Sequence, residues 1–233
     1  LPHVIALVIF ALVAAIYCKP ALEGKVLQQS DITLWKGAAH NSMQYFDKHG
    51  HMPLWTNGIF SGMPAFQLTG LGENPIGIGN LQNVLTLGLP KPISFFFLAC
   101  ICFYFLSQIL NVNPYIGIIG SLGYAYATYN PIIITAGHET KMIAIAYIPA
   151  MIGSILLVFN KKYLSGAAFT AMFTALLVGA NHPQISYYTL LIVAFMSIGF
   201  AIQWIQEKDF KHLFTALSTA CLLYTSPSPR DGL

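Results

Sequence analysis

Three ionisable residues crowd the short turn at residues 138–141, and a lone carboxylate, Asp31, lies far upstream in the segment QQSDITLW. The ammonium group of Lys141 is a strong point-charge partner for a phosphate, and His138 can add a second contact to it. Glu139 can orient either of these side chains. The alternative for this turn is a solvated loop in which Lys141 extends to lipid headgroups.

Asp31 has two chemical interpretations and one structural interpretation. A carboxylate can act as a general base on an acceptor hydroxyl, or it can hold a divalent cation. The same residue can instead cap the start of a helix, which typically contributes about 1 kcal/mol. The local sequence does not choose between these roles.

A second polar turn, NHPQ at residues 181–184, carries His182 and Gln184. Pro183 suits the first turn of a helix, so Asn181 has the alternative role of a helix cap. His49 and His51 lie close together, but no nearby Cys or spaced acid completes a metal-ligand pattern. The chain has no Gly-x-Ser-x-Gly, no His-Glu-x-x-His and no nucleotide-binding fingerprint, which argues against a soluble-type hydrolase or ATPase.

The composition is that of a membrane protein. Hydrophobic residues make up 56% of the 233 residues, charged residues make up 8%, and the mean hydropathy is +0.64. This is too little charge for a soluble surface. The net charge of +3 is too small and too dispersed to suggest a nucleic-acid partner. Cys18, Cys100 and Cys102 lie within or at the end of apolar segments, so no disulfide framework is predicted.

Several apolar segments approach the length needed to cross a bilayer core, which is about 20 helical residues. They are residues 1–18, 93–110, 115–134, 142–159, 164–180 and 185–205, and a further segment begins near residue 213. The predicted fold is therefore all-α, as a polytopic transmembrane helix bundle. Gly117, Ser121 and Ala125, spaced by four, predict close packing of the third segment against a neighbour.

Lysines in short loops predict the orientation of the chain. Lys161 and Lys162 lie in one such loop and Lys208 and Lys211 in another, so both loops are expected on the cytoplasmic side. The long segment 19–92 and the turns at 136–141 and 179–184 then share the outer face. Polar chemistry is therefore expected outside the cell membrane.

Aromatic residues complete the membrane interpretation. Tyr187 and Tyr188 are expected to anchor the outer end of one helix, and Trp204 its inner end. The run Phe95, Phe96 and Phe97 is expected to face lipid.

Within the outer segment, Ser30 or Asp31 is predicted to cap a helix that runs to about Lys48 and ends at Gly50. Such a helix would lie on the outer interface. The next stretch, PLWTNGIFSGMPAFQLTG, is dense in Gly, Pro and aromatic residues. That composition indicates an ordered irregular loop that covers a cavity.

The last residues break the composition of the chain. Residues 221–233 contain two Ser-Pro steps and the sole arginine, and 221–231 match the translation of a sequencing adaptor. They are expected to be a non-native tail. Residues 1–220 are then expected to be the N-terminal part of a multi-spanning membrane domain.

Four segments carry a family resemblance: LEGKVLQQSDITLWKG, PLWTNGIFSGMPAFQ, AGHETKMIAIAYIPA and ANHPQISYYTLLI, in that order. Together they resemble the bacterial YfhO-like membrane proteins, which are placed with the GT-C superfamily of polytopic glycosyltransferases. The likeness covers residues 1–220. Members of this family are typically several times longer, so activity is expected of the full-length protein rather than of this part alone.

The resemblance implies transfer of a sugar from a polyprenyl-phosphate donor to a glycan or polymer acceptor on the outer face of the bacterial cytoplasmic membrane. Enzymes of this superfamily place an essential acid in the first outer loop, and Asp31 matches that position. Asp31 is therefore assigned as general base or metal-holding acid, which leaves a divalent cation open as cofactor. Lys141 and His138 are assigned to the donor phosphate, with Glu139, His182 and Gln184 as supporting groups.

Two other classes stay open as alternatives. A carrier or flippase of lipid-linked sugars would bind headgroups without chemistry, although transporters usually bind near the bilayer midplane with broken helices and buried charge. A noncatalytic assembly subunit would leave Asp31 exposed and far from Lys141. The glycosyltransferase hypothesis requires instead that Asp31 and the turn at 138–141 border one cleft.

Overall fold

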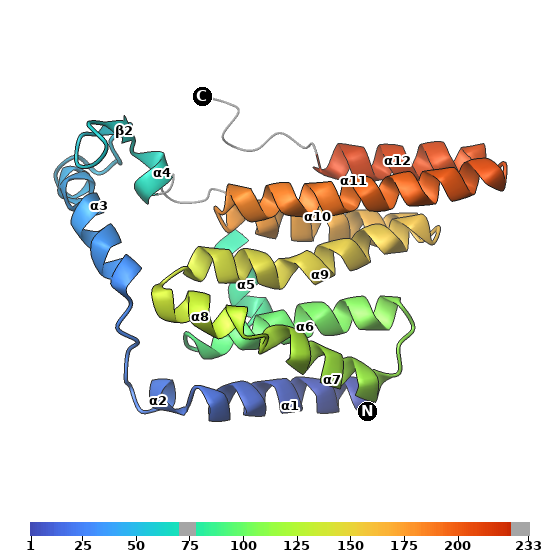
Figure 1. Cartoon of the computed structure of the whole chain (residues 1–233), viewed down its shortest axis with the longest axis horizontal. Coiled ribbons are helices and arrows are strands. Elements are labelled where there is room, and N and C mark those ends of the chain that lie inside the picture. The colour runs from blue at the N-terminus through green and yellow to red at the C-terminus, as the bar shows by residue number, and fades with distance from the viewer. Residues whose placement is uncertain (70–77, 225–233) are drawn as a thin grey trace.

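The computed structural model describes residues 1–69 and 78–224, which form an all-α structure apart from one short pair of strands (Figure 1). The all-α prediction is therefore confirmed. The bundle is built from α1 (Pro2–Tyr17), α6 (Ile93–Ile109), α7 (Pro114–Ala125), α8 (Tyr129–Ala136), α9 (Glu139–Phe159), α10 (Tyr163–Gly179), α11 (Pro183–Gln206) and α12 (Phe210–Tyr224). Tail residues 225–233 lie outside the described residues.

Two of the described helices, α9 and α11, are long and apolar enough to cross a membrane by length and composition. Of these, α9 lies at the centre of the bundle, where it packs on α6, α10 and α11, and most of it is buried. The apolar helices α1, α6 and α10 have 16 or 17 residues each. That is somewhat short of the about 20 residues that a bilayer core requires.

The third apolar segment is interrupted, and the prediction of one continuous helix over 115–134 is wrong. It divides into α7 and α8 between Ala125 and Tyr129. The buried Asn130 side chain donates through Nδ2 to the carbonyl oxygens of Tyr124 at 3.0 Å and Ala125 at 3.2 Å. These bonds satisfy carbonyl groups that the end of α7 leaves free. Pro131, which lacks an N–H, suits the first turn of the new helix.

The predicted close packing of α7 is confirmed. Gly117, Ser121 and Ala125 are all buried, and a Cβ on Gly117 would lie 2.6 Å from the hydroxyl oxygen of Ser107 on α6. The small residues therefore let the two helices approach closely.

Two aromatic predictions are wrong. Phe95, Phe96 and Phe97 are each at most 2% exposed, because α1, α7 and α9 surround α6. The Phe96 ring stacks on Tyr126 with 4.8 Å between ring centroids. Trp204 is buried rather than interfacial, since its ring packs on Phe159 and on the side chain of His212.

The outer segment begins with α2 (Lys19–Leu22) and continues into α3 (Ser30–His49), which leads away from the bundle (Figure 1). Gly50 ends α3 in a left-handed conformation, as predicted, and its N–H donates to the Phe46 carbonyl at 2.8 Å. The start differs from the prediction, because the N-cap residue is Gln29 and no side chain caps the helix. Asp31 therefore lies inside the first turn, and its helix-cap interpretation is wrong.

Beyond α3 the chain forms the ladder β1 (Trp55–Thr56) and β2 (Met63–Pro64), then α4 (Phe66–Thr69). The strands are antiparallel, with Trp55 paired to Pro64. Trp35 on α3 donates its indole N–H to the Leu68 carbonyl at 2.6 Å and so ties α4 back to α3. The chain re-enters the bundle through α5 (Ile78–Leu85).

Candidate functional site

Asp31 and His138 lie in contact at the end of the bundle from which α3 departs. The Asp31 Oδ2 atom is 3.1 Å from His138 Nε2, and the two side chains are 43% and 49% exposed. The first turn of α3 thereby meets the turn between α8 and α9. The contact brings together the two segments that the glycosyltransferase hypothesis places at one cleft, but neither Asp31 nor residues 138–141 line the cavity beside them.

The backbone explains why these two distant segments meet. Gln29 donates through Nε2 to the Ile134 carbonyl on α8 at 2.6 Å. Gly137 ends α8 with φ of +109°, and a Cβ there would lie 3.0 Å from Ile32 Cγ1 and 3.2 Å from the Ile32 nitrogen. Only a glycine allows both this conformation and this approach. His138 follows as the N-cap residue of α9, directly beside Asp31.

An open cavity of about 910 Å³ lies between α3 and α8. It is lined by Gln28, Ser30, Thr33, Leu34, Pro131, Ile132, Thr135 and Ala136. The Ser30 hydroxyl donates to Asp31 Oδ1 at 3.4 Å, so the acid is one hydrogen bond from the cavity wall. A wall of mixed hydroxyl and apolar groups suits an amphiphilic ligand.

The sequence predicted that Glu139 orients Lys141 or His138. In the structure it contacts neither of them with its carboxylate. Its carboxylate instead forms an ion pair with Lys91 at 2.6 Å. The Lys141 ammonium lies 5.2 Å from the centre of the Tyr129 ring. Within residues 1–69 and 78–224, Lys141 forms no ion pair with a carboxylate. Its charge is therefore available to an anionic ligand.

His182 shares the electrostatic environment of this site. Burial lowers its pKa, and the positive charges of Lys141 and His138 lower it further. His182 is the N-cap residue of α11, whereas Asn181, with φ of +56°, follows the C-cap of α10 and ends that helix in a left-handed conformation. Gln184 donates to the hydroxyl of Tyr188 on its own helix at 2.8 Å and makes no contact with the Asp31 pair.

Lys141→Met is expected to raise the pKa of His182 toward its ordinary value of about 6.5. Because burial and the charge of Lys141 disfavour the imidazolium, His182 costs stability as the pH falls below about 6.5. Removal of the Lys141 charge should reduce the loss of folding stability at low pH. An NMR titration of His182 measures the shift, and Lys162→Met at the far end of the bundle is the control. An unchanged pKa would show that the two side chains do not interact.

Gly137→Ala is expected to lower the sugar transfer that the family resemblance implies by about 100-fold, because an ångström of misplacement has that effect. The added methyl group would press on the first turn of α3 and separate Asp31 from His138. Gly24→Ala is a matched control: Gly24 has φ of +76°, but a Cβ there meets nothing within 4 Å. Both variants carry a backbone cost of about 1–2 kcal/mol. Equal activities in transfer assays would contradict the prediction.

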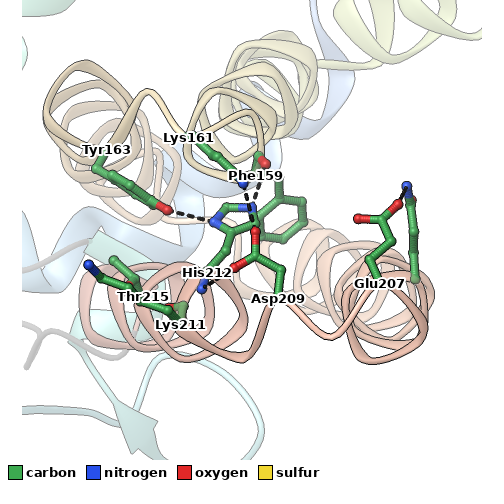
Figure 2. A network of polar contacts seen from close by, with 9 residues as sticks. Phe159, Lys161, Tyr163, Glu207, Asp209, Lys211, His212 and Thr215 are labelled. Atoms are coloured by element: carbon green, nitrogen blue, oxygen red, sulfur yellow. Dashed lines mark hydrogen bonds and ion pairs between the residues drawn. The ribbon is translucent and has the colours of Figure 1, made fainter.

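A second polar cluster surrounds His212 at the opposite end of the bundle (Figure 2). His212 is 4% exposed; its Nδ1 atom lies 2.6 Å from the Tyr163 hydroxyl and its Nε2 atom 2.8 Å from the Phe159 carbonyl. Asp209 accepts from the His212 backbone N–H at 3.2 Å and pairs with Lys161 at 2.6 Å. The pairing lowers the pKa of Asp209 and raises that of Lys161.

The sequence did not predict this cluster, since Lys161 served there only as an indicator of membrane orientation. The spacing of Asp209 and His212 at a helix start is a capping pattern that could have revealed part of it. Both ring nitrogens of His212 have protein partners, so the cluster fastens α9, α10 and α12 together. We assign it a structural role.

No metal-ligand set is present in the described part of the chain, since no three His, Cys, Asp or Glu side chains gather there. His49 and His51 pack instead against Tyr45, with ring centroids 4.3 and 5.5 Å away. Comparisons with protein-family models, curated proteins and solved structures find no match to this chain. The site is therefore interpreted from its own chemistry.

Proposed function

We propose that the protein is a GT-C-like glycosyltransferase that moves a sugar from a polyprenyl-phosphate donor to an extracytoplasmic glycan or polymer. One observation carries the proposal: Asp31 of the outer segment lies 3.1 Å from His138, the N-cap residue of α9, whose first turn carries Lys141. Sugar transfer needs a group that takes a proton from the acceptor and a cation that stabilises the departing phosphate. The Asp31 pair supplies the first, and the Lys141 ammonium supplies the second.

The surface of α11 supports a multi-pass position in the bacterial cytoplasmic membrane. This helix exposes large apolar side chains along its length: Leu190, Leu191, Ile192, Phe195, Ile198, Ile202 and Ile205. Soluble monomers rarely expose a contiguous apolar patch of this extent. Lys161, Lys162 and Lys208 lie in the loops at the end opposite to Asp31, and Lys211 lies in the first turn of α12 at the same end, which fits a cytoplasmic placement of that end.

The test is an assay of the full-length protein in proteoliposomes with radiolabelled polyprenyl-phosphate sugars and a glycan acceptor. We expect labelled sugar to appear in the acceptor. Parallel reactions with EDTA separate the two interpretations of Asp31: transfer that persists favours proton chemistry, and transfer restored only by added Mg²⁺ favours a cation. Absence of labelled acceptor with every donor would contradict the proposal.

The interruption between α7 and α8 favours a second candidate, a carrier or flippase of lipid-linked sugars, because transporters often use broken helices. In this protein the Asn130 side chain satisfies the carbonyl groups at the interruption. The carbonyl groups at the break therefore bond within the protein and are not available to a ligand. Movement of labelled donor across the proteoliposome membrane without transfer would favour the carrier.

A further inference from the structure

We propose that the hairpin of β1 and β2 is a glycan-binding surface, on which Trp55 and Phe60 stack against the sugar rings of a neutral glycan acceptor. The role of that glycan as acceptor rests on the proposed function. The surface belongs to the outer segment, and it is separate from the contact between Asp31 and His138.

The turn of the hairpin combines a strained backbone with an exposed aromatic side chain. The Gly62 N–H donates to the Ile59 carbonyl at 3.0 Å, and the residues between them, Phe60 and Ser61, have φ of +53° and +60°. Positive φ at both central positions is the pattern of a type I′ turn, which favours Asn and Gly. Phe60 occupies this position although it is 86% exposed and adds little to the core. Backbone strain of this kind clusters at ligand-binding sites.

Trp55 is held in one orientation while much of its ring stays in solvent. Its indole N–H donates to Asn57 Oδ1 at 3.0 Å. The ring packs on Gly62, where a Cβ would lie 2.7 Å from Trp55 Nε1. Gly62 has φ of +122°, so a glycine suits both the backbone and the ring. Trp55 is nevertheless 57% exposed. Because its side chain is already ordered, a ligand that stacks on it loses little conformational entropy.

The chemistry of the hairpin fits a neutral glycan better than a lipid surface. Residues 52–69 contain no charged side chain. Segments that bind membrane surfaces are typically rich in Lys and Arg. The face of an aromatic ring carries partial negative charge, so the C–H groups of a sugar pack against it. The Asn57 amide beside Trp55 and the Ser61 hydroxyl beside Phe60 are neutral groups that can bond the sugar hydroxyls.

The hairpin and α4 lie beside α3 (Figure 1), and their contacts with this helix begin one turn beyond Asp31. Trp35 is on the same side of α3 as Asp31, and its indole N–H donates to the Leu68 carbonyl at 2.6 Å. A Cβ on Gly58 would lie 3.2 Å from the Ala38 carbonyl oxygen, so the loop between the strands also rests on α3. Ala38 follows Asp31 by about 10 Å along the helix axis. A glycan chain that stacks on the hairpin can therefore extend to the candidate site.

Phe60→Asn is the decisive variant, because Asn suits the left-handed backbone of the turn better than Phe does. We expect it to unfold at the wild-type temperature or higher, yet to bind glycan about 10-fold more weakly, since a stacked ring is lost. The probes are neutral hexasaccharides of glucose, galactose and N-acetylglucosamine, titrated against the full-length protein in detergent micelles. Tyr115→Asn, at an exposed aromatic residue of α7, is the matched control and should keep the wild-type affinity. Equal affinities in Phe60→Asn and the wild type would overturn the proposal.

A second measurement follows Trp55 directly. The chain has three tryptophans, and fluorine-19 NMR of protein labelled with 5-fluorotryptophan gives a signal for each. Loss of one signal in Trp55→Phe identifies that of Trp55. In proteoliposomes we expect a hexasaccharide to shift this signal and a spin-labelled lipid to leave it sharp. A signal that the spin-labelled lipid broadens, and that no hexasaccharide shifts, would instead assign the hairpin to the membrane surface and overturn the proposal.

Kinetics separate this proposal from the proposed function. We expect Phe60→Asn to raise the KM for the glycan acceptor about 10-fold with an unchanged kcat, because the ring contributes to binding and not to the chemistry. An unchanged acceptor KM in this variant would overturn the acceptor role of the hairpin while sugar transfer stands. Glycan binding without any sugar transfer would overturn the proposed function and leave the glycan-binding surface in place.

Discussion

Asp31→Asn is expected to lower kcat for sugar transfer by about 10²–10⁴-fold while the protein remains folded. The amide accepts no proton and carries no charge, so it can neither act as a base nor stabilise an imidazolium on His138. The side chain is 43% exposed, and its loss removes only a surface contact from the fold. The effect should therefore appear in transfer kinetics and not in thermal unfolding.

Asp47→Asn is the matched control for this prediction. Asp47 lies on the same helix, α3, near its other end, and its side chain is exposed. It should transfer sugar at the wild-type rate. If the two Asn variants have the same kcat, Asp31 has no part in the chemistry.

His212→Ala is expected to reduce the free energy of unfolding by about 3–5 kcal/mol. The substitution removes two hydrogen bonds and leaves the Phe159 carbonyl and the Tyr163 hydroxyl without their partner. It also opens a space against Trp204, whose ring centroid lies 4.4 Å from that of His212. Unfolding in detergent micelles, followed by the near-ultraviolet signal of tryptophan, measures the change.

His40→Ala provides the comparison for that experiment. His40 is exposed on α3, and its side chain contacts Gln44 of the same helix at 3.1 Å. Its removal should change stability by less than about 0.5 kcal/mol, as surface substitutions usually do. Similar losses in both variants would show that the His212 cluster does not fasten the bundle.

Local patterns in the sequence were sufficient for most of the long helices of the bundle. The apolar segments, the small residues Gly117, Ser121 and Ala125, and the stop at Gly50 all predicted what the structure has. These features depend on neighbours within a few residues. The interruption of the third segment was not predicted. It depends on a buried side chain, Asn130, which donates to a carbonyl group at the break.

Which face of a helix is buried could not be predicted from composition. Phe95, Phe96 and Phe97 are spaced about 100° apart around α6. All three are buried because α1, α7 and α9 pack around this helix. An apolar helix between other helices has the same composition as one that faces lipid. Trp204 illustrates the same ambiguity at a helix end.

Only part of the predicted cluster of polar side chains comes together in the structure. Asp31 and the turn at 138–141 were expected to meet, and Asp31 contacts His138. Glu139 pairs with Lys91 instead, which no local pattern indicates, because an ion pair between distant segments depends on tertiary packing. Gln184 is likewise turned to its own helix.

The placement of Asp31 at the anchored end of α3 has a mechanical consequence. The helix has 20 residues and is about 30 Å long, with its first turn resting on Gly137 and its far end leading to the β1–β2 ladder (Figure 1). The helix can tilt about its first turn, which lies beside the Asp31 carboxylate. A tilt of about 10° moves the far end by about 5 Å but Asp31 by less than about 1 Å. A tilt of this size therefore leaves the Asp31 carboxylate close to the His138 imidazole.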